Sequence, residues 1–260
     1  MSVREPTLVL VSILGAGFSY GPWLAAIGQR YPRLLLDVDG VRGRTLGDLA
    51  IEQVELLRAT RAGAPLVFAG WSAGGVLAHE MARAWYERLG ALPPVLMIDS
   101  TALTPPDPVP AHELLNDFLR DLALSTGIQA PVLAPDDARG APREVFADVV
   151  ARLRQQGRGY QLDLADLMAR YEAFDEVTRL VREHDPTPYP GQVCLVQAAQ
   201  TDTEAADWTP LCGSLRVSVL PGNHYTVLRA QPERLVLLGA RLLDASAAAA
   251  RPTPRDEVVR

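Results

Sequence analysis

The feature of this sequence that most restricts its fold is a set of six short apolar runs spread along the chain. They occupy residues 7–14, 34–38, 65–70, 94–99, 192–199 and 215–220. The first run, TLVLVSIL, is bounded by Pro6 and Gly15, which is typical of a buried strand. Because the runs are nearly continuous rather than alternating with polar residues, they favour a parallel sheet covered on both faces.

Segments with helical periodicity alternate with these runs. Residues 46–58, 75–89 and 232–243 repeat their apolar side chains at spacings of three and four residues. Alternating strands and helices predict an α/β fold, with a mostly parallel sheet and helices on both faces. The chain of 260 residues is long enough for one sizeable core.

One region, about residues 100–190, interrupts the alternation. It contains no convincing strand, and its connections are rich in proline. Amphipathic stretches lie near residues 111–124, 143–155 and 161–183. We interpret the region as a helical insertion between the fourth and fifth strands of a single domain spanning residues 1–245. Residues 246–260 have little apolar content and are expected to form a flexible tail.

The insertion is a candidate lid, because long insertions in compact domains are usually functional. Apolar residues of its first amphipathic stretch, such as Leu115, Phe118 and Leu119, are then expected to face the substrate. The alternative is a helical layer with a purely structural role.

Charge and composition exclude several classes of protein. The net charge is −6 and the charges are scattered, which argues against nucleic-acid binding. No run of 18 apolar residues exists, so no membrane span is expected. The first apolar run follows Glu5 and Pro6 and has no basic segment before it, which indicates a strand rather than a signal peptide. Cys194 and Cys212 are too few for a disulfide framework and are expected to be buried thiols in a reducing cytoplasm.

The third run leads directly into Gly70-Trp71-Ser72-Ala73-Gly74, between an expected strand and an expected helix. This is the setting of a G-x-S-x-G nucleophile elbow. The turn is sharp, so bulky side chains at Gly70 and Gly74 would collide with neighbouring backbone. Ser72 is therefore a candidate nucleophile at the N-terminus of a helix.

A serine nucleophile needs a base and an acid that orients the base. Of the four histidines, His224 lies in a loop, GNHY, between the last strand and the last helix, at the same edge of the sheet as Ser72. Two acids follow strands at that edge, Asp99 and Asp202, and the residues by themselves barely separate them. Asp99 comes directly after an apolar strand, which would fix its position better than a polar loop fixes Asp202.

Two backbone amides could hold an oxyanion. The amide of Ala73 follows the nucleophile, and the amide near Ala16 lies in the glycine-containing loop after the first strand. The same loop, with Asp37 and Asp39 after the next strand, also resembles a dinucleotide fingerprint. Its third glycine, however, falls one position too late for G-x-G-x-x-G.

A metal site is not expected. The segment from His112 to Asn116, HELLN, carries asparagine where a second zinc-ligand histidine would stand.

Three segments resemble the thioesterase domains that end nonribosomal peptide and polyketide synthases. ILGAGFSYGPW is similar to the family's F-P-G-A-G-G-S-A-x-x-F loop, with Ile13 and Leu14 in place of Phe-Pro. GWSAGGVLAHEMA resembles its nucleophile segment, and GNHYTVL resembles its histidine loop. The likeness covers about residues 7–243 and is loose over the insertion.

The resemblance implies an α/β-hydrolase that releases an acyl or peptidyl chain from the phosphopantetheine arm of a carrier protein. It implies no cofactor of the protein's own, and a partner that brings the small-molecule acyl chain. Product-releasing members of the family usually place the acid where Asp99 stands, whereas editing members place it near Asp202. Three alternatives remain open, namely an editing thioesterase, an esterase for small oxygen esters, and a non-catalytic binding protein on a hydrolase scaffold.

Overall fold

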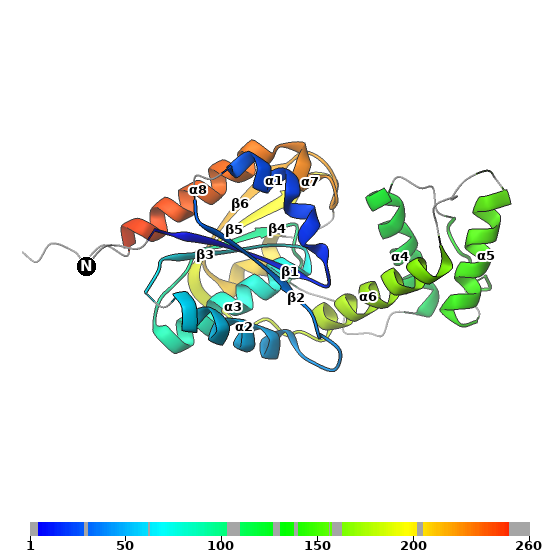
Figure 1. The fold of residues 1–260 in the computed structure, drawn as a ribbon, viewed down its shortest axis with the longest axis horizontal. Helices are drawn as coiled ribbons and strands as arrows, with labels where there is room; N and C mark the ends of the chain where they lie inside the picture. Colours follow the sequence, from blue (N-terminus) through cyan, green and yellow to red (C-terminus); the bar gives the residue numbers. More distant parts are fainter. Residues whose placement is uncertain are drawn as a thin grey trace, which may run out of the picture. The chain divides into compact units, whose positions relative to one another are not determined.

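The computed structural model describes residues 5–28, 31–61, 63–102, 110–126, 131–137, 140–155, 157, 163–201 and 205–249. Within them, six parallel strands form one sheet in the order β2-β1-β3-β4-β5-β6 (Figure 1). The strands are β1 (Thr7–Ile13), β2 (Arg33–Val38), β3 (Leu66–Trp71), β4 (Val95–Ile98), β5 (Tyr189–Ala198) and β6 (Cys212–Leu220). Each predicted apolar run is a strand, so the predicted α/β class is confirmed.

Helices cover both faces of this sheet. Figure 1 shows α1 (Gly21–Ile27), α7 (Val227–Ala230) and α8 (Pro232–Ala249) on one side, with α2 (Leu46–Arg61) and α3 (Ala73–Leu89) on the other. Two 3₁₀ turns, η1 (Ala16–Tyr20) and η2 (Ala205–Leu211), follow β1 and precede β6. Helices α1 and α7 and both 3₁₀ turns were not predicted, because these elements are too short to show a clear periodicity.

The core on the α1 and α8 side shows why the strands are almost wholly apolar. The paired residues Leu10 of β1 and Ala69 of β3 are both fully buried there. Trp23 of α1 and Leu235 of α8 belong to the same cluster and are also inaccessible to solvent. Helix α3 packs on the opposite face of β1, β3 and β4. Side chains that point to either face of these strands are therefore buried.

The chain divides into two compact units. The first contains the sheet and comprises residues 1–103 and 183–260, and the second comprises residues 104–182. The second contains α4 (Ala111–Thr126), α5 (Pro142–Gln155) and α6 (Leu164–Arg182), in agreement with the three amphipathic stretches expected in the insertion.

The second unit has a hydrophobic core of its own, centred on aromatic rings. The ring of Phe118 lies with its centroid 5.3 Å from those of Phe146 and Tyr171 and 5.6 Å from that of Phe174. Asn116, which stands at the second ligand position of the near-miss zinc motif, instead exchanges two hydrogen bonds with the backbone of Leu133, at 2.9 and 2.8 Å.

The structure places Leu115, Phe118 and Leu119 differently from the expectation that they face the substrate. Each is at most 2% exposed and belongs to the core shared by the helices of the second unit. Their periodicity shows that they lie on one apolar face of α4, but it does not show what covers that face. A neighbouring helix and a bound substrate would both require the same apolar pattern. These three side chains therefore serve packing within the unit.

The C-terminal prediction also needs correction. Helix α8 continues through Ala249, so the first four residues of the expected flexible tail are helical. The Ser246 hydroxyl donates a hydrogen bond to the carbonyl of Leu66 at 3.2 Å. Residues 250–260 lie outside the described residues. Among the helices that the structure describes, none is both long enough and apolar enough to cross a bilayer.

Candidate active site

Three neighbouring strands end at the same edge of the sheet in an unusual backbone conformation. In the described residues, the non-glycine residues with positive φ are Leu14 (51°), Ser72 (56°) and Asp99 (49°). Each is the first residue after a strand, namely β1, β3 and β4. Such conformations cost about 1–3 kcal/mol each and tend to cluster at functional sites. Strand β2 lies on one side of β1, and the next strand along the chain, β3, lies on its other side. The strand order therefore reverses at β1, and the carboxyl edge beside it is a topological switch point.

Ser72 lies between β3 and α3, as the elbow motif predicts. Its φ and ψ are 56° and −130°, and its amide donates to the carbonyl of Ile98 at 2.8 Å. A Cβ at Gly70 would stand 2.1 Å from the carbonyl oxygen of Gly74, and one at Gly74 would stand 2.4 Å from that of Val11. The predicted need for glycine at both positions is confirmed, since neither contact could be relieved without moving backbone.

Gly75 is a third required glycine, which the motif alone did not indicate. A Cβ at this position would lie 2.0 Å from the Ser100 hydroxyl oxygen and 2.9 Å from the carbonyl oxygen of Gly70. The first turn of α3 therefore packs directly against the segment that follows β4. This contact holds the nucleophile elbow beside Asp99.

Asp99 and His224 are 125 residues apart in the sequence and form a hydrogen-bonded pair. The His224 Nδ1 atom lies 2.8 Å from Oδ2 of Asp99. Because an ionised carboxylate can only accept, this pairing assigns the proton to Nδ1 and leaves Nε2 as the basic ring atom. The Asp99 residue is 2% exposed, whereas the His224 side chain is 24% exposed. The base is therefore accessible and its acid is not.

Two further donors hold the Asp99 carboxylate. The Ala198 amide donates to Oδ1 at 2.8 Å, and the Thr201 hydroxyl donates to Oδ2 at 2.9 Å. With His224, the buried carboxylate receives three hydrogen bonds, which compensate for the loss of water around it. Thr201 was not predicted, since its only signal in the sequence is a hydroxyl residue shortly after β5. The rival acid, Asp202, lies outside the described residues.

Trp71, the residue before Ser72, contacts the histidine loop in two ways. Its indole N–H donates to the carbonyl of His224 at 2.9 Å, and the two ring centroids are 4.8 Å apart. In the described part of the chain, the Ser72 hydroxyl makes no hydrogen bond to the imidazole. Catalytic hydrogen bonds of this kind are often long before substrate binds. Trp71 thus brings His224 beside the elbow.

Asn223 shapes the loop that carries His224. Its side-chain oxygen accepts hydrogen bonds from the amides of Tyr225 and Thr226, each at 3.0 Å. This Asx-type turn fixes the backbone on both sides of the histidine. A Pro-Gly-Asn run directly after a strand is a turn signal, so the role of Asn223 could have been predicted from the sequence.

Each of the two predicted oxyanion donors is the first residue of a helical element near the elbow. Ala73 is the first residue of α3, and Ala16 is the first residue of η1. Asp37 on β2 accepts hydrogen bonds at Oδ1 from the Ser12 hydroxyl at 2.8 Å and from the Gly15 amide at 3.1 Å. Asp37, considered above as part of a dinucleotide fingerprint, therefore binds the loop that carries Ala16.

Neither cysteine offers an alternative nucleophile. Burial raises the pKa of the Cys194 thiol to about 11 and that of the Cys212 thiol to about 12. Both thiols stay protonated near neutral pH, and the thiolate is the reactive form.

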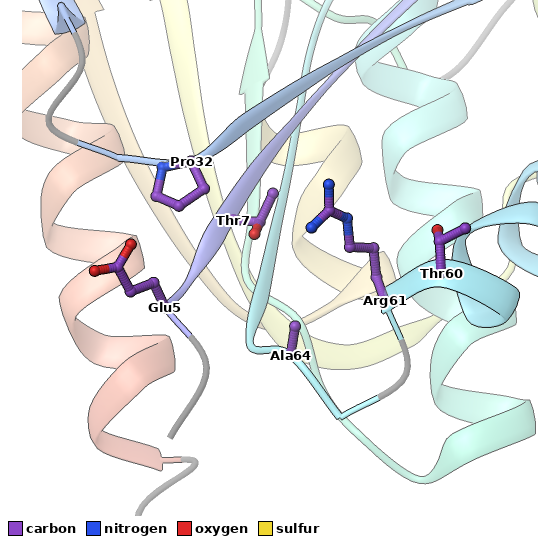
Figure 2. A pocket seen from close by; sticks show the side chains of 6 residues that line it. All are labelled: Glu5, Thr7, Pro32, Thr60, Arg61 and Ala64. Carbon is purple, nitrogen blue, oxygen red and sulfur yellow. The ribbon is translucent and has the colours of Figure 1, made fainter. Parts of the chain in front are cut away.

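A cavity of about 440 Å³ lies at the opposite edge of the sheet, near the amino ends of β1 and β3 (Figure 2). It is lined by Glu5, Thr7, Pro32, Thr60, Arg61 and Ala64. None of the candidate catalytic residues contributes to it.

The sheet order, the elbow at Ser72 and the His224–Asp99 pair at the carboxyl edge define the α/β-hydrolase class. Comparison with known proteins narrows the class. The model of the thioesterase domain family matches residues 40–238. Non-reducing polyketide synthase 1 of Elsinoe fawcettii is 23% identical over 173 residues, which are 64% of this chain and 7% of that protein. The chain thus corresponds to a small part of this relative.

Solved structures agree in fold. A four-domain nonribosomal peptide synthetase bound to AMP and glycine matches 96% of this chain and 20% of its own, with a TM-score of 0.70 and 20% identity. The NocB thioesterase domain, in covalent complex with a fluorophosphonate nocardicin G analogue, matches 90% of this chain and 96% of its own. Its TM-score is 0.55 and its identity 23%. The chain belongs to the thioesterase domain family, as the family model indicates over most of its length. Membership of this family makes it a thioester-hydrolysing enzyme.

Proposed function

We propose that this thioesterase releases a finished acyl or peptidyl chain from the phosphopantetheine thioester of a carrier protein. The observation that carries the proposal is the 2.8 Å pairing of Asp99 with His224 beside the Ser72 elbow. A serine, a buried carboxylate and a histidine in this order along the chain, here Ser72, Asp99 and His224, are the components of an α/β-hydrolase triad. The phosphopantetheine belongs to the carrier, and the thioesterase itself uses no cofactor.

In the first half-reaction Ser72 attacks the thioester carbonyl. Nε2 of His224 takes the proton of the Ser72 hydroxyl while its oxygen forms the new bond to carbon. The amides of Ala73 and Ala16 stabilise the negative charge on the carbonyl oxygen. The carbon–sulfur bond then breaks, the imidazolium returns the proton to the leaving sulfur, and an acyl ester remains on Ser72. Throughout, Asp99 orients the imidazole and stabilises its charged form.

In the second half-reaction a nucleophile displaces Ser72. Water gives a free acid, and a hydroxyl or amine within the acyl chain gives a ring. His224 accepts the proton of the nucleophile and gives it to the Ser72 oxygen as the ester breaks.

The position of the acid favours release over editing. Asp99 follows the strand after the nucleophile helix, where product-releasing members of the resembled family usually carry their acid. Its carboxylate is fixed by three donors, as an orienting acid requires. Editing is the second candidate function, and it is distinguished from release by the preferred acyl chain.

The test is intact-protein mass spectrometry after exposure to carrier-bound thioesters. One set of carriers bears long acyl or peptidyl chains, and the other bears short acyl groups such as acetyl. We expect an acyl adduct on Ser72 and faster turnover with the long chains. Faster turnover of the short groups would indicate editing, and turnover of oxygen esters alone would indicate an esterase.

Ser72→Ala is the control for the covalent step. It should keep the fold and lose essentially all turnover and all labelling by a fluorophosphonate, because the attacking oxygen is gone. A Ser72→Ala protein that retains the wild-type rate would overturn the mechanism.

A further inference from the structure

The hydrogen-bond ladder between β1 and β3 is interrupted at the nucleophile elbow. The amide of Thr7 donates to the carbonyl of Pro65, and the strands pair in register up to Val11 and Gly70. In a parallel ladder with this register, the next bond would run from the Trp71 amide to the Val11 carbonyl. That bond would close the two strands together directly before Ser72.

The hydroxyl of Tyr20 takes the place of this bond. It donates to the carbonyl of Val11 at 2.6 Å and accepts from the amide of Trp71 at 2.8 Å. The inserted oxygen keeps β1 and β3 apart at their carboxyl ends. On the other side of β3 the ladder continues, since the Ser72 amide still bonds to Ile98 of β4.

The same hydroxyl also lies at the first turn of α3. A Cβ on Gly74 would stand 3.4 Å from the Tyr20 oxygen and 2.4 Å from the Val11 carbonyl oxygen. The buried Tyr20 hydroxyl therefore contacts three elements at once, namely β1, the end of β3 and the start of α3. Tyr20 is itself the last residue of η1, whose first residue is Ala16.

The hydroxyl is suited to a permanent structural link. Tyr20 is 1% exposed, and its ring packs edge-on against Trp23. Burial, as the largest cause, raises its pKa well above the usual value of 10.0, so the group remains a neutral donor. The resembled family's loop carries alanine at this place, so the motif gave no reason to expect the link.

We propose that Tyr20 is a positioning residue that sets the spacing between the two oxyanion donors and the Ser72 oxygen. Its hydroxyl holds η1, which begins with Ala16, at a fixed distance from the elbow, which continues into Ala73. Without the hydroxyl, the Trp71 amide and the Val11 carbonyl can pair directly. The elbow would then move toward β1 without unfolding. This inference rests on the proposed serine mechanism.

The test compares Tyr20→Phe with a matched control, Tyr189→Phe. Tyr189 is 0% exposed and donates its hydroxyl to the carbonyl of Pro93 at 2.7 Å, at the amino edge of the sheet. Both changes delete one buried hydroxyl, and only the first lies at the elbow. For Tyr20→Phe we expect kcat to fall about tenfold, as the loss of a buried hydrogen bond suggests, with KM within about twofold. Binding of an alkyl boronic acid, which forms a tetrahedral adduct with serine, should weaken by the same factor.

For Tyr189→Phe we expect a lower denaturation midpoint with unchanged kcat and unchanged boronic acid affinity. The positioning role would be overturned if the two variants, compared at equal folded fraction, had the same kcat and the same boronic acid affinity. It would also be overturned if Tyr20→Phe lowered only the denaturation midpoint. Ser72→Ala separates this result from failure of the mechanism itself. If Ser72→Ala retains activity, the proposed function is wrong, whereas a dead Ser72→Ala with an active Tyr20→Phe rejects only the role of Tyr20.

Discussion

The Asp99–His224 pair at the carboxyl edge of the sheet and the pair of Glu80, on α3, with His184 combine similar chemical groups in different surroundings. Nε2 of His184 lies 3.2 Å from Oε1 of Glu80, and Nε of Arg83 lies 2.8 Å from Oε2. Glu80 is 1% exposed and the His184 side chain 9%, against 24% for that of His224. Both carboxylates are buried, so burial does not distinguish the proposed catalytic pair from the other one.

The difference lies in what surrounds each carboxylate and what the free ring nitrogen can reach. Asp99 receives neutral donors and a single imidazole, which leaves Nε2 of His224 available beside the elbow. Glu80 stands between a guanidinium and two imidazoles, those of His184 and His79. The Nδ1 atom of His79 lies 3.6 Å from Oε1 of Glu80. The second arrangement neutralises a buried charge and presents no open base. A histidine–carboxylate pair therefore indicates catalysis only together with an accessible nitrogen and a nucleophile.

The largest expected effect comes from breaking the first pair. Asp99→Asn should lower kcat by about 10⁴, because the amide no longer selects the tautomer with a basic Nε2. The fold should remain, since the Asn side-chain oxygen can still accept from the Ala198 amide while its NH2 group donates to the Thr201 hydroxyl and the His224 ring nitrogen, which can both accept. Steady-state rates on a carrier-bound thioester check this, and a loss below tenfold would argue that another acid serves His224.

Breaking the second pair should give the reverse result. Glu80→Gln should lower the free energy of unfolding by about 3 kcal/mol, because it leaves the largely buried guanidinium of Arg83 without its counter-charge. Its kcat should stay close to that of the wild type, since Glu80 is remote from the reacting atoms. Urea denaturation and kinetics on the same preparation measure both quantities. A fall in kcat without a fall in stability would contradict the structural role.

Thr201→Val sharpens the comparison within the Asp99–His224 pair. It removes one of three donors to the Asp99 carboxylate while keeping the shape of the side chain. We expect about a tenfold fall in kcat, the size of one hydrogen bond to a charged group. Thr201→Ser, which retains the hydroxyl, should restore most of the rate, and failure of this rescue would point to packing instead.

The smallest effect is a pH dependence of stability. Burial by itself raises the pKa of Glu80, but His184, His79 and Arg83 together outweigh it and hold that pKa well below the usual 4.5. Below pH 4.5 the unfolded chain takes up a proton at this residue before the folded protein does, so the contribution is complete above that pH and declines as the pH falls further. Glu80→Gln should flatten this acid limb in unfolding experiments between about pH 3 and pH 6. An identical slope in both proteins would exclude Glu80 as its source.

The sequence by itself determined the features that depend on neighbouring residues. Six apolar runs predicted the six strands, because an apolar segment of that length must be buried in a sheet covered by helices. The glycines around Ser72 predicted the elbow, because the clash of a Cβ with nearby backbone is a local steric fact. His224 was singled out because its loop lies between the last strand and the last helix, at the carboxyl edge where parallel strands place their functional residues.

Only the tertiary structure decided which distant groups meet. Asp99 reaches His224 across 125 residues, Trp71 reaches Tyr20 across 51, and Thr201 reaches Asp99 across 102. Periodicity placed Leu115, Phe118 and Leu119 on one face of α4, but the expectation that this face meets the substrate was wrong, because it packs in the core of the second unit. The physical reason is that sequence patterns record how each segment must be oriented, whereas a hydrogen bond between segments depends on positions set to within a few tenths of an ångström by the packing of the whole fold.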